Sequence, residues 1–329
     1  MKIDKNNIKT ILFITLSNLG DIILTTPVLE KLCDEFPGAS VDVITGPAGR
    51  GLFSAHPRVR NVIVHKKRTS LKERLGFFLE LRRGKYDLTV DLKNSLLPYI
   101  LGARCRTSVL DLSVPGRHKK EGHLTKLLNL GLDAFSGTRF FLPVSEEERT
   151  SADGILSSNE GRKVVLMNPG AKSHLKRWDS GKFAKLADRL IEELDCSVLV
   201  CGNEDDRETV ECFMASVTQP VINLCCRTSV GILSELMRKS SLVITNDSAP
   251  LHMASAVNAP TIAIFGPSDE KKYGPLADKS RVVKPVISCR PCEKALCEVG
   301  PDEGCISNVT VDEVFEAAKE LLKRGDRHG

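Results

Sequence analysis

Short apolar runs alternate with longer stretches of helical periodicity through most of the chain. In the first half, the runs that predict strands lie at residues 11–16, 41–44, 62–64 and 88–90, with a fifth near 107–110. A second series lies at residues 164–168, 197–201, 221–223, 242–245 and 261–265. Short apolar runs separated by helical segments are typical of parallel sheets covered by helices. The pattern therefore predicts an α/β fold.

Two helices have clear signals in the sequence. Residues 22–36 follow the first predicted strand, place apolar side chains on one face and stop before Pro37. Residues 310–323 begin with a capping box formed by Thr310 and Glu313, and their apolar residues repeat on one face. The last helix of the chain is thus expected to be strongly amphipathic.

A polar stretch separates the two series of strands. Residues 143–163 contain a capping box, Ser145 with Glu148, and a turn near the end of the stretch. A chain of 329 residues also exceeds the usual size of a single core. We therefore expect two domains, residues 1–160 and residues 161–329.

The composition is that of a soluble globular protein, with 41% hydrophobic and 27% charged residues. No apolar run approaches the length of about 18 residues that a membrane span requires. The first apolar run is also too short for the core of a signal peptide. We therefore expect a cytoplasmic protein whose 11 cysteines are mostly reduced thiols.

The net charge of +5 is unevenly distributed. Residues 1–150 carry 24 Lys and Arg against 16 Asp and Glu, whereas residues 151–329 carry 23 against 26. A basic first half favours an anionic partner such as a phosphorylated lipid, a nucleic acid or a membrane surface, unless the excess is solvated surface charge. An aromatic content of 5% argues against single-stranded nucleic acid, which is bound by stacking.

The segment 17–21, Ser-Asn-Leu-Gly-Asp, joins the first predicted strand to the helix behind it. Asp is a preferred helix N-cap, so Asp21 is one candidate for that structural role. The alternative is a general base at the carboxyl edge of a parallel sheet, where α/β enzymes bind their ligands. Gly20 lets the backbone come close to a ligand.

A basic segment follows the first strand of the second half. Gly170 frees the backbone, and Lys176 and Arg177 are suited to neutralising a diphosphate. The alternative is a basic surface loop held by Trp178, the one tryptophan of the chain. Both interpretations stay open at this point.

Two further polar segments end predicted strands in the second half. Asp247 and Ser248 open a helix whose N–H groups suit the charge of a leaving group, and His252 adds either a donor or a structural side chain. In the segment 201–208, a carboxylate such as Asp206 either accepts from ribose hydroxyls or belongs to a solvated acidic loop.

Taken together, these segments resemble the ADP-heptose:lipopolysaccharide heptosyltransferases, the family 9 glycosyltransferases. The resemblance extends over about residues 10–320. It rests on the order and spacing of three pieces, residues 16–27, 168–178 and 246–267. It implies a GT-B fold, with an N-terminal acceptor domain, a C-terminal donor domain and a last helix that crosses back to the first domain.

The resemblance also implies roles for particular residues. Asp21 matches the proposed general base of an inverting transfer, and Lys176 matches a lysine near the donor diphosphate. The remaining donor-binding residues that it implies are Gly170, Asp206, Asp247, Ser248, Ala249 and His252. Many relatives have glycine where this chain has Ala249, which leaves the donor open. Candidate acceptor contacts are Ser17, Asn18, Gly20, Arg117, Lys119 and Lys120.

Two other features are not explained by that chemistry. Four thiols fall within 17 residues, at Cys289, Cys292, Cys297 and Cys305, and either hold a structural metal or remain reduced. Residues 71–85 form a basic amphipathic helix, which either lies on an anionic membrane or covers the sheet and shows its charges to water.

The sequence thus favours a cytoplasmic glycosyltransferase, peripheral at the inner face of the membrane, that moves heptose from ADP-heptose to an anionic glycolipid acceptor and needs no cofactor for catalysis. One alternative is a GT-B enzyme with another donor or acceptor, such as O-antigen, another glycan or a protein. Another is a non-catalytic nucleotide-sugar-binding protein. A nicotinamide dehydrogenase is not expected, because no Gly-x-Gly-x-x-Gly follows the first strand. Nucleic acid is not an expected partner.

Overall fold

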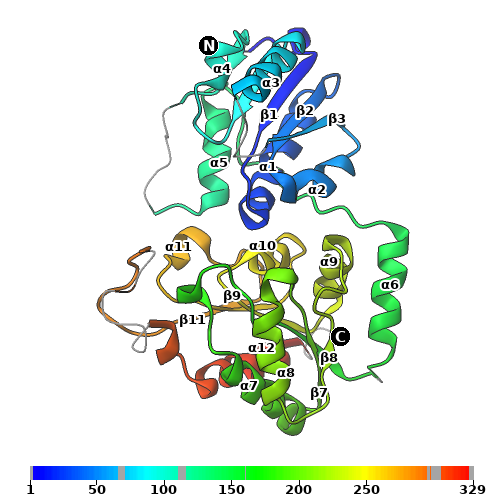
Figure 1. Ribbon diagram of the computed structural model, residues 1–329, viewed down its shortest axis with the longest axis vertical. Coiled ribbons are helices and arrows are strands. Elements are labelled where there is room, and N and C mark those ends of the chain that lie inside the picture. Colours follow the sequence, from blue (N-terminus) through cyan, green and yellow to red (C-terminus); the bar gives the residue numbers. More distant parts are fainter. Residues whose placement is uncertain are drawn as a thin grey trace. The chain divides into compact units, whose positions relative to one another are not determined.

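The computed structural model describes residues 3–65, 71–109, 116–159, 161–294, 297 and 305–325. Contacts divide the chain into two compact units, Met1–Pro143 and Val144–Gly329, each built around one parallel sheet (Figure 1). The predicted α/β fold is confirmed. Within the residues described, no helix has the length and apolar character needed to span a bilayer.

The sheet of the first unit has the strand order β3-β2-β1-β4-β5. Its strands are β1 (Thr10–Ile14), β2 (Ser40–Thr45), β3 (Val59–Val64), β4 (Leu88–Asp91) and β5 (Cys105–Arg106). The first four overlap the predicted runs. The fifth is shifted, because β4 pairs with Cys105 and Arg106. The last residue of the run expected near 107–110 lies outside the described residues.

Helices cover both faces of this sheet, as the alternation of side chains along β1 requires. They are α1 (Leu19–Glu35), α2 (Arg50–Ser54), α3 (Leu71–Arg83), α4 (Leu97–Ile100) and α5 (Lys119–Leu128). Phe13 of β1 meets Phe53 of α2 with ring centroids 6.3 Å apart. Leu12 and Ile14 point the other way, into an apolar cluster to which α3 and α4 contribute.

The sheet of the second unit has the order β11-β10-β9-β6-β7-β8. Its strands are β6 (Lys163–Asn168), β7 (Cys196–Val200), β8 (Ile222–Asn223), β9 (Leu242–Asn246), β10 (Thr261–Ile264) and β11 (Ser280–Val283). The first five overlap predicted runs, but β11 was not predicted. It is an edge strand, and the exposed Arg281 interrupts its apolar character.

Most helices of the second unit cover the two faces of that sheet. They are α6 (Glu146–Ser157), α7 (Ser180–Leu194), α8 (Arg207–Ser216), α9 (Val230–Lys239), α10 (Ala249–Ala256), α11 (Glu270–Tyr273) and α12 (Val311–Gly325). On one face, a large apolar core gathers Trp178, Phe183, Phe213 and Phe315, all at most 1% exposed. This core fixes the carboxyl ends of β6 and β9, where the candidate site lies.

The division between the units falls at residues 143 and 144, earlier than the boundary expected near residue 160. The intervening α6 belongs to the second unit because it packs on α9. Glu148 accepts a hydrogen bond from Ser229, and Lys239 pairs with Asp153. The polar composition of this stretch predicted the helix and its capping box but not the unit to which the helix belongs.

The last helix, α12, is part of the core of the second unit. Val314, Phe315 and Ala318 lie in the same apolar cluster as β6, β7 and β9, and Lys163 donates to the carbonyl of Leu322 at 3.2 Å. The expected crossing of residues 310–323 to the first domain stays a prediction, and the contacts described for α12 are those with its own unit. The apolar face of α12 packs on the sheet of the second unit.

Candidate active site

Asp21 lies beyond the carboxyl end of β1, in the first turn of α1. The N-cap of that helix is Asn18, whose backbone is extended (φ −89°, ψ 143°), so Asp21 does not occupy the capping position. The hydrogen bond described for its carboxylate comes from Asn18 Nδ2 at 3.1 Å. Asp21 is partly exposed, and its carboxylate is therefore available to accept a proton from a bound hydroxyl.

The loop after β2 holds the segment before Asp21 in place. Gly46 donates its amide to the carbonyl of Leu16 at 3.3 Å, and a Cβ built on Gly46 would lie 2.7 Å from Ser17 Cα. Only glycine permits this approach. Gly46 was not among the predicted site residues, because its approach to Ser17 depends on β1 and β2 being neighbours in the sheet.

In the second unit, Lys176 and Asp247 form an ion pair at the carboxyl edge of the sheet. Lys176 ends the short helix η3 (His174–Lys176) after β6, Asp247 directly follows β9, and these two strands pair. Lys176 Nζ lies 2.6 Å from Asp247 Oδ2, and the two side chains are 33% and 3% exposed. The buried carboxylate thus holds a partly exposed positive charge at the edge, where it can meet an anion.

Tyr273 and Asn246 complete this arrangement, and neither was among the predicted site residues. The Tyr273 ring centroid lies 5.6 Å from Lys176 Nζ. Asn246 Nδ2 donates to the carbonyls of Pro169 and Gly170, and its Oδ1 accepts from the amide of Trp178 at 3.1 Å. Asn246 therefore ties the end of β9 to the loop that carries Lys176.

Trp178 fixes the far end of the same loop. Its indole is fully buried, and Nε1 donates to the carbonyl of Val309 at 2.9 Å. Arg177 donates to the carbonyl of Ala171 at 2.7 Å, so it stabilises the loop. The burial of Trp178 agrees with the structural interpretation of this segment, while the role of Lys176 in neutralising a diphosphate stays a prediction.

Gly170 and Asp206 are brought together by the pairing of β6 with β7. A Cβ built on Gly170 would lie 2.1 Å from Asp206 Oδ1. Asp206 belongs to the short helix η4 (Glu204–Asp206) before α8, and its Oδ2 accepts from the amide of Asn203 at 3.1 Å. The carboxylate therefore lies directly over the backbone of the loop that leads to Lys176.

This close approach makes Gly170→Ala a specific test of the loop. The added methyl group is expected to displace Asp206 and lower the free energy of unfolding by about 1–3 kcal/mol. If the loop binds the predicted nucleotide-sugar donor, the affinity for that donor should also fall roughly tenfold. Gly154→Ala in α6 is the matched control, because nothing lies within 4 Å of its added Cβ. Denaturant titration and calorimetry measure the two effects, and equal results for both variants would contradict the proposed contact.

The electrostatics of Asp206 differ from those of an exposed carboxylate. Burial raises its pKa above the ordinary value of 3.8, and the hydrogen bond from the Asn203 amide and the positive charge of Arg177 only partly oppose this shift. An acid with a raised pKa binds protons more tightly in the folded state than in the unfolded state. Its ionisation therefore reduces the free energy of unfolding as the pH rises from 3.8 through the higher folded pKa.

Asp206→Asn is accordingly expected to gain stability relative to the wild type as the pH rises through that window. At low pH the two proteins differ little, because the wild-type carboxyl is then neutral, and at neutral pH the variant has the higher Tm. Thermal unfolding at a series of pH values measures the difference. If the difference in Tm between Asp206→Asn and the wild type shrinks as the pH rises, burial is not the dominant cause of the pKa shift of Asp206.

The N-terminus of α10 offers fewer donors than its sequence suggested. Pro250 has no N–H group, and the Leu251 amide donates to the carbonyl of Ser248 at 3.1 Å. Ser248 is partly exposed, with its Oγ 3.4 Å from Thr245 Oγ1. Ala249 begins the helix beside it. The hydroxyl of Ser248 is thus the polar group of this turn best placed to meet a ligand.

His252 lies one turn further along α10 and is only 6% exposed. This burial favours the structural alternative for His252. In the first unit, His118 caps α5 by accepting from the amide of Lys120 at 3.1 Å. The basic residues Arg117 and Lys120 lie 5.7 and 5.6 Å from the rings of Phe135 and Phe140, and Lys119 is the first residue of α5. No hydrogen bond in the described part of the unit joins these basic residues to the segment 17–21.

The C-terminal cysteines lie beside the loop after β10. The amide of Cys292 donates to the carbonyl of Pro267 at 3.1 Å, and Cys289, Cys297 and Cys305 are at least partly exposed. All 11 cysteines are free thiols. Among the residues that the structure describes, no three His, Cys, Asp or Glu side chains are arranged to hold a metal ion. A structural metal at these four cysteines therefore stays a prediction.

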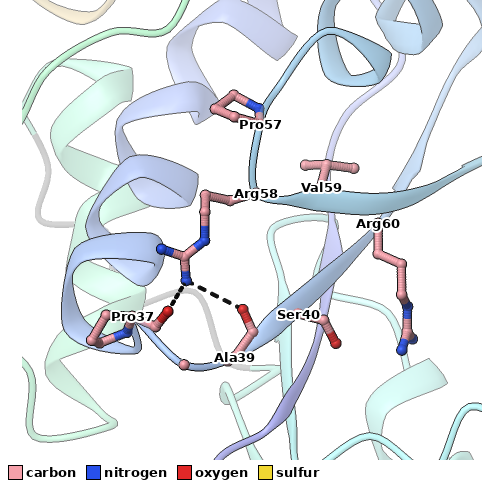
Figure 2. Close-up of a pocket in the computed structure, with 8 residues that line it drawn as sticks. Pro37, Ala39, Ser40, Pro57, Arg58, Val59 and Arg60 are labelled. Atoms are coloured by element: carbon pink, nitrogen blue, oxygen red, sulfur yellow. Dashed lines mark hydrogen bonds between the residues drawn. The ribbon is translucent and has the colours of Figure 1, made fainter.

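Two surface pockets lie at the opposite edges of the sheets. One, of about 310 Å³, is lined by residues at the amino ends of β2 and β3; Figure 2 shows Arg58 there, donating to the carbonyls of Pro37 and Ala39. The other, of about 590 Å³, includes Asn159 and Arg162 beside the amino ends of β7 and β8. Open α/β sheets bind their ligands at the carboxyl edge, so neither pocket is the candidate site.

Comparisons with known proteins agree with this geometry. The family model described as glycosyltransferase family 9 (heptosyltransferase) matches residues 129–302. Lipooligosaccharide heptosyltransferase 2 of Campylobacter jejuni is 26% identical over 93% of this chain and 96% of its own length. Lipopolysaccharide heptosyltransferase 3 of Escherichia coli is 29% identical over 78% of this chain and 83% of its own length.

Solved structures give the same assignment. ADP-heptose lps heptosyltransferase II of E. coli superposes with a TM-score of 0.76 at 26% identity, over 96% of this chain and 99% of the other. The family 9 glycosyltransferase of Veillonella parvula superposes with a TM-score of 0.81 at 25% identity, over 96% and 97%. The two parallel sheets are therefore those of a GT-B fold. The chain belongs to glycosyltransferase family 9 and is a glycosyltransferase.

Proposed function

We propose that this protein transfers a heptose from ADP-heptose to the inner core of lipopolysaccharide, with lipid A-Kdo or a heptosylated core as the acceptor. The observation that carries the proposal is the Lys176–Asp247 pair, which fixes a positive charge at the carboxyl edge of the second sheet. A diphosphate needs such a charge when it departs. The names of the relatives supply the donor and acceptor class.

In the proposed mechanism, the acceptor binds the first unit and the donor binds the second. Asp21 removes the proton from an acceptor hydroxyl, whose oxygen forms a bond to the anomeric carbon of the heptose. The bond from that carbon to the diphosphate oxygen breaks, and ADP leaves from the opposite face, so the anomeric configuration inverts. Lys176 and the Ser248 hydroxyl stabilise the charge that develops on the diphosphate.

Catalysis in this scheme needs no metal ion, because the leaving group is neutralised by Lys176. The acceptor is a phosphorylated amphiphile, which places the reaction at the cytoplasmic face of the inner membrane. The excess of positive charge in residues 1–150 suits that anionic acceptor. Ser17, Asn18 and Gly20, at the edge that carries Asp21, are the proposed acceptor contacts.

Calorimetric titration with ADP, UDP, GDP and their sugars, first with a chelator and then with magnesium, tests the donor. Selective binding of ADP-heptose in both conditions supports the proposal. Preference for another nucleotide moves the function to a GT-B enzyme with a different donor. If the protein binds ADP-heptose but releases no ADP when lipid A-Kdo or its heptosylated form is present, it either uses a different acceptor or is non-catalytic.

A further inference from the structure

The helix α3 is apolar on two opposite faces. Phe77 and Leu81 pack inward on the cluster that contains Leu12 and Ile14 of β1. On the outer side, Leu75 and Leu79 are 60% and 47% exposed. Covering the sheet therefore explains the inner face of α3 but not the outer one.

The neighbouring helix α4 repeats this arrangement. Leu97 and the following Leu101 pack on the same apolar cluster as α3, so both helices cover the same face of the sheet. Leu96, Tyr99 and Ile100 are 66%, 45% and 57% exposed. The outer sides of α3 and α4 together expose five large apolar side chains. Single exposed apolar residues are ordinary, but a group on adjoining elements marks an interaction surface.

Basic side chains accompany these apolar residues. Lys72, Arg82 and Arg83 are exposed, and with Leu75 and Leu79 they fall within an arc of about 100° around α3. Glu80, the exposed acidic residue among the described side chains of the helix, lies outside that arc. Near α4, the Arg106 guanidinium lies 4.4 Å from the centroid of the Tyr99 ring. The outer surface is thus both apolar and positively charged.

We propose that this surface, Lys72, Leu75, Leu79, Arg82, Arg83, Leu96, Tyr99, Ile100 and Arg106, binds the anionic lipid bilayer that holds the acceptor. Leucine and tyrosine side chains enter the interfacial region while lysine and arginine meet lipid phosphates, which is the chemistry of an interfacial helix. A protein partner could cover these leucines without basic residues beside them, whereas an anionic bilayer is bound by apolar and basic side chains together. This inference rests on the proposed function only in identifying the acceptor as a lipid held in the bilayer. The surface itself is inferred from the exposed side chains of α3 and α4.

The surface is joined to the candidate site by the topology of the sheet. α4 follows the carboxyl end of β4, and the Leu92 amide there donates to the carbonyl of Ile14 at the end of β1 at 2.9 Å. Asp21 follows the end of β1. An acceptor that projects from a bilayer under α4 therefore emerges near the sheet edge that carries the proposed base.

Co-sedimentation of the full-length protein with vesicles tests the proposal. We expect binding to vesicles of phosphatidylglycerol and phosphatidylethanolamine, weaker binding to phosphatidylcholine, and a decrease with salt. The triple variant Lys72→Gln/Arg82→Gln/Arg83→Gln should lower the partition coefficient by roughly fivefold for each charge. Leu75→Gln/Leu79→Gln/Ile100→Gln should lower it by about tenfold for each side chain.

Matched controls separate this surface from general charge and hydrophobicity. Lys185→Gln/Lys279→Gln/Lys323→Gln removes three exposed charges from the second unit, and Leu128→Gln/Val286→Gln removes exposed apolar groups elsewhere. Both controls should bind like the wild type. Circular dichroism and thermal unfolding verify that all variants are folded.

The outcomes distinguish this proposal from the proposed function. Unchanged vesicle binding in both surface variants, or no binding by the wild type, overturns the membrane surface even if ADP-heptose binds and transfer occurs. If the wild type self-associates and does not bind vesicles, and the self-association is lost in Leu75→Gln/Leu79→Gln/Ile100→Gln, the surface is a protein interface and the membrane proposal is overturned. Vesicle binding that depends on the surface, in a protein that binds no ADP-heptose, supports the surface and refutes the proposed donor.

Discussion

Asp21→Asn is expected to lower kcat by about a hundredfold to ten-thousandfold, the usual contribution of a general base. The amide has nearly the same shape and can still accept a hydrogen bond from Asn18, but it cannot take a proton from the acceptor. Because the donor is proposed to bind the second unit, its Kd should change little. ADP release with a lipid A-Kdo acceptor measures the rate, and calorimetry measures the affinity for the donor.

Two further variants in the first unit make this result specific. Asp4→Asn alters an exposed carboxylate that caps a single helical turn, and it should leave kcat unchanged. Asn18→Ala removes the hydrogen bond that orients Asp21 and should reduce kcat by less than about tenfold. If Asp21→Asn retained full activity, or lost donor binding together with activity, the assignment of Asp21 as the base would be wrong.

The apolar periodicity was sufficient to predict most strands, because strands buried on both faces form continuous apolar runs. It failed where burial is incomplete. β5 has only two residues, and β11 is an edge strand with Arg281 exposed in its middle. The division between the units differs from the expected boundary for another reason. The helix α6 packs on α9 of the second unit, and the hydrogen bond from Ser229 to Glu148 joins positions 81 residues apart, so the local sequence does not indicate this contact.

The candidate site shows the same limit. Each polar segment was predicted separately from its place after a strand, but the meeting of Lys176 with Asp247 depends on β6 lying beside β9. The backbone angles of Asn18 were needed to exclude Asp21 as the helix N-cap, and its role as a base stays a prediction. Gly46 and Tyr273 were missed because their importance arises from contacts with segments distant in the sequence.

Lys176→Met is expected to raise the Kd for ADP-heptose by roughly tenfold to a hundredfold, the effect of losing a charge-assisted contact to a phosphate. The variant keeps the length of the side chain but leaves the Asp247 carboxylate, which is 3% exposed, without its cation. We also expect the free energy of unfolding to fall by about 1–3 kcal/mol, less than for a fully buried pair, because a third of the Lys176 side chain reaches solvent. Lys172→Met removes an exposed lysine of the same loop and should change neither quantity.

The double variant Lys176→Met/Asp247→Asn then separates two roles for the lysine. Removing both charges should restore most of the stability, because no buried carboxylate is left without a cation. If Lys176 contacts the diphosphate, the double variant still binds ADP-heptose weakly and transfers heptose slowly. Recovery of binding along with stability would instead mean that Lys176 only neutralises Asp247, and the positive charge that stabilises the leaving group would have to come from another residue.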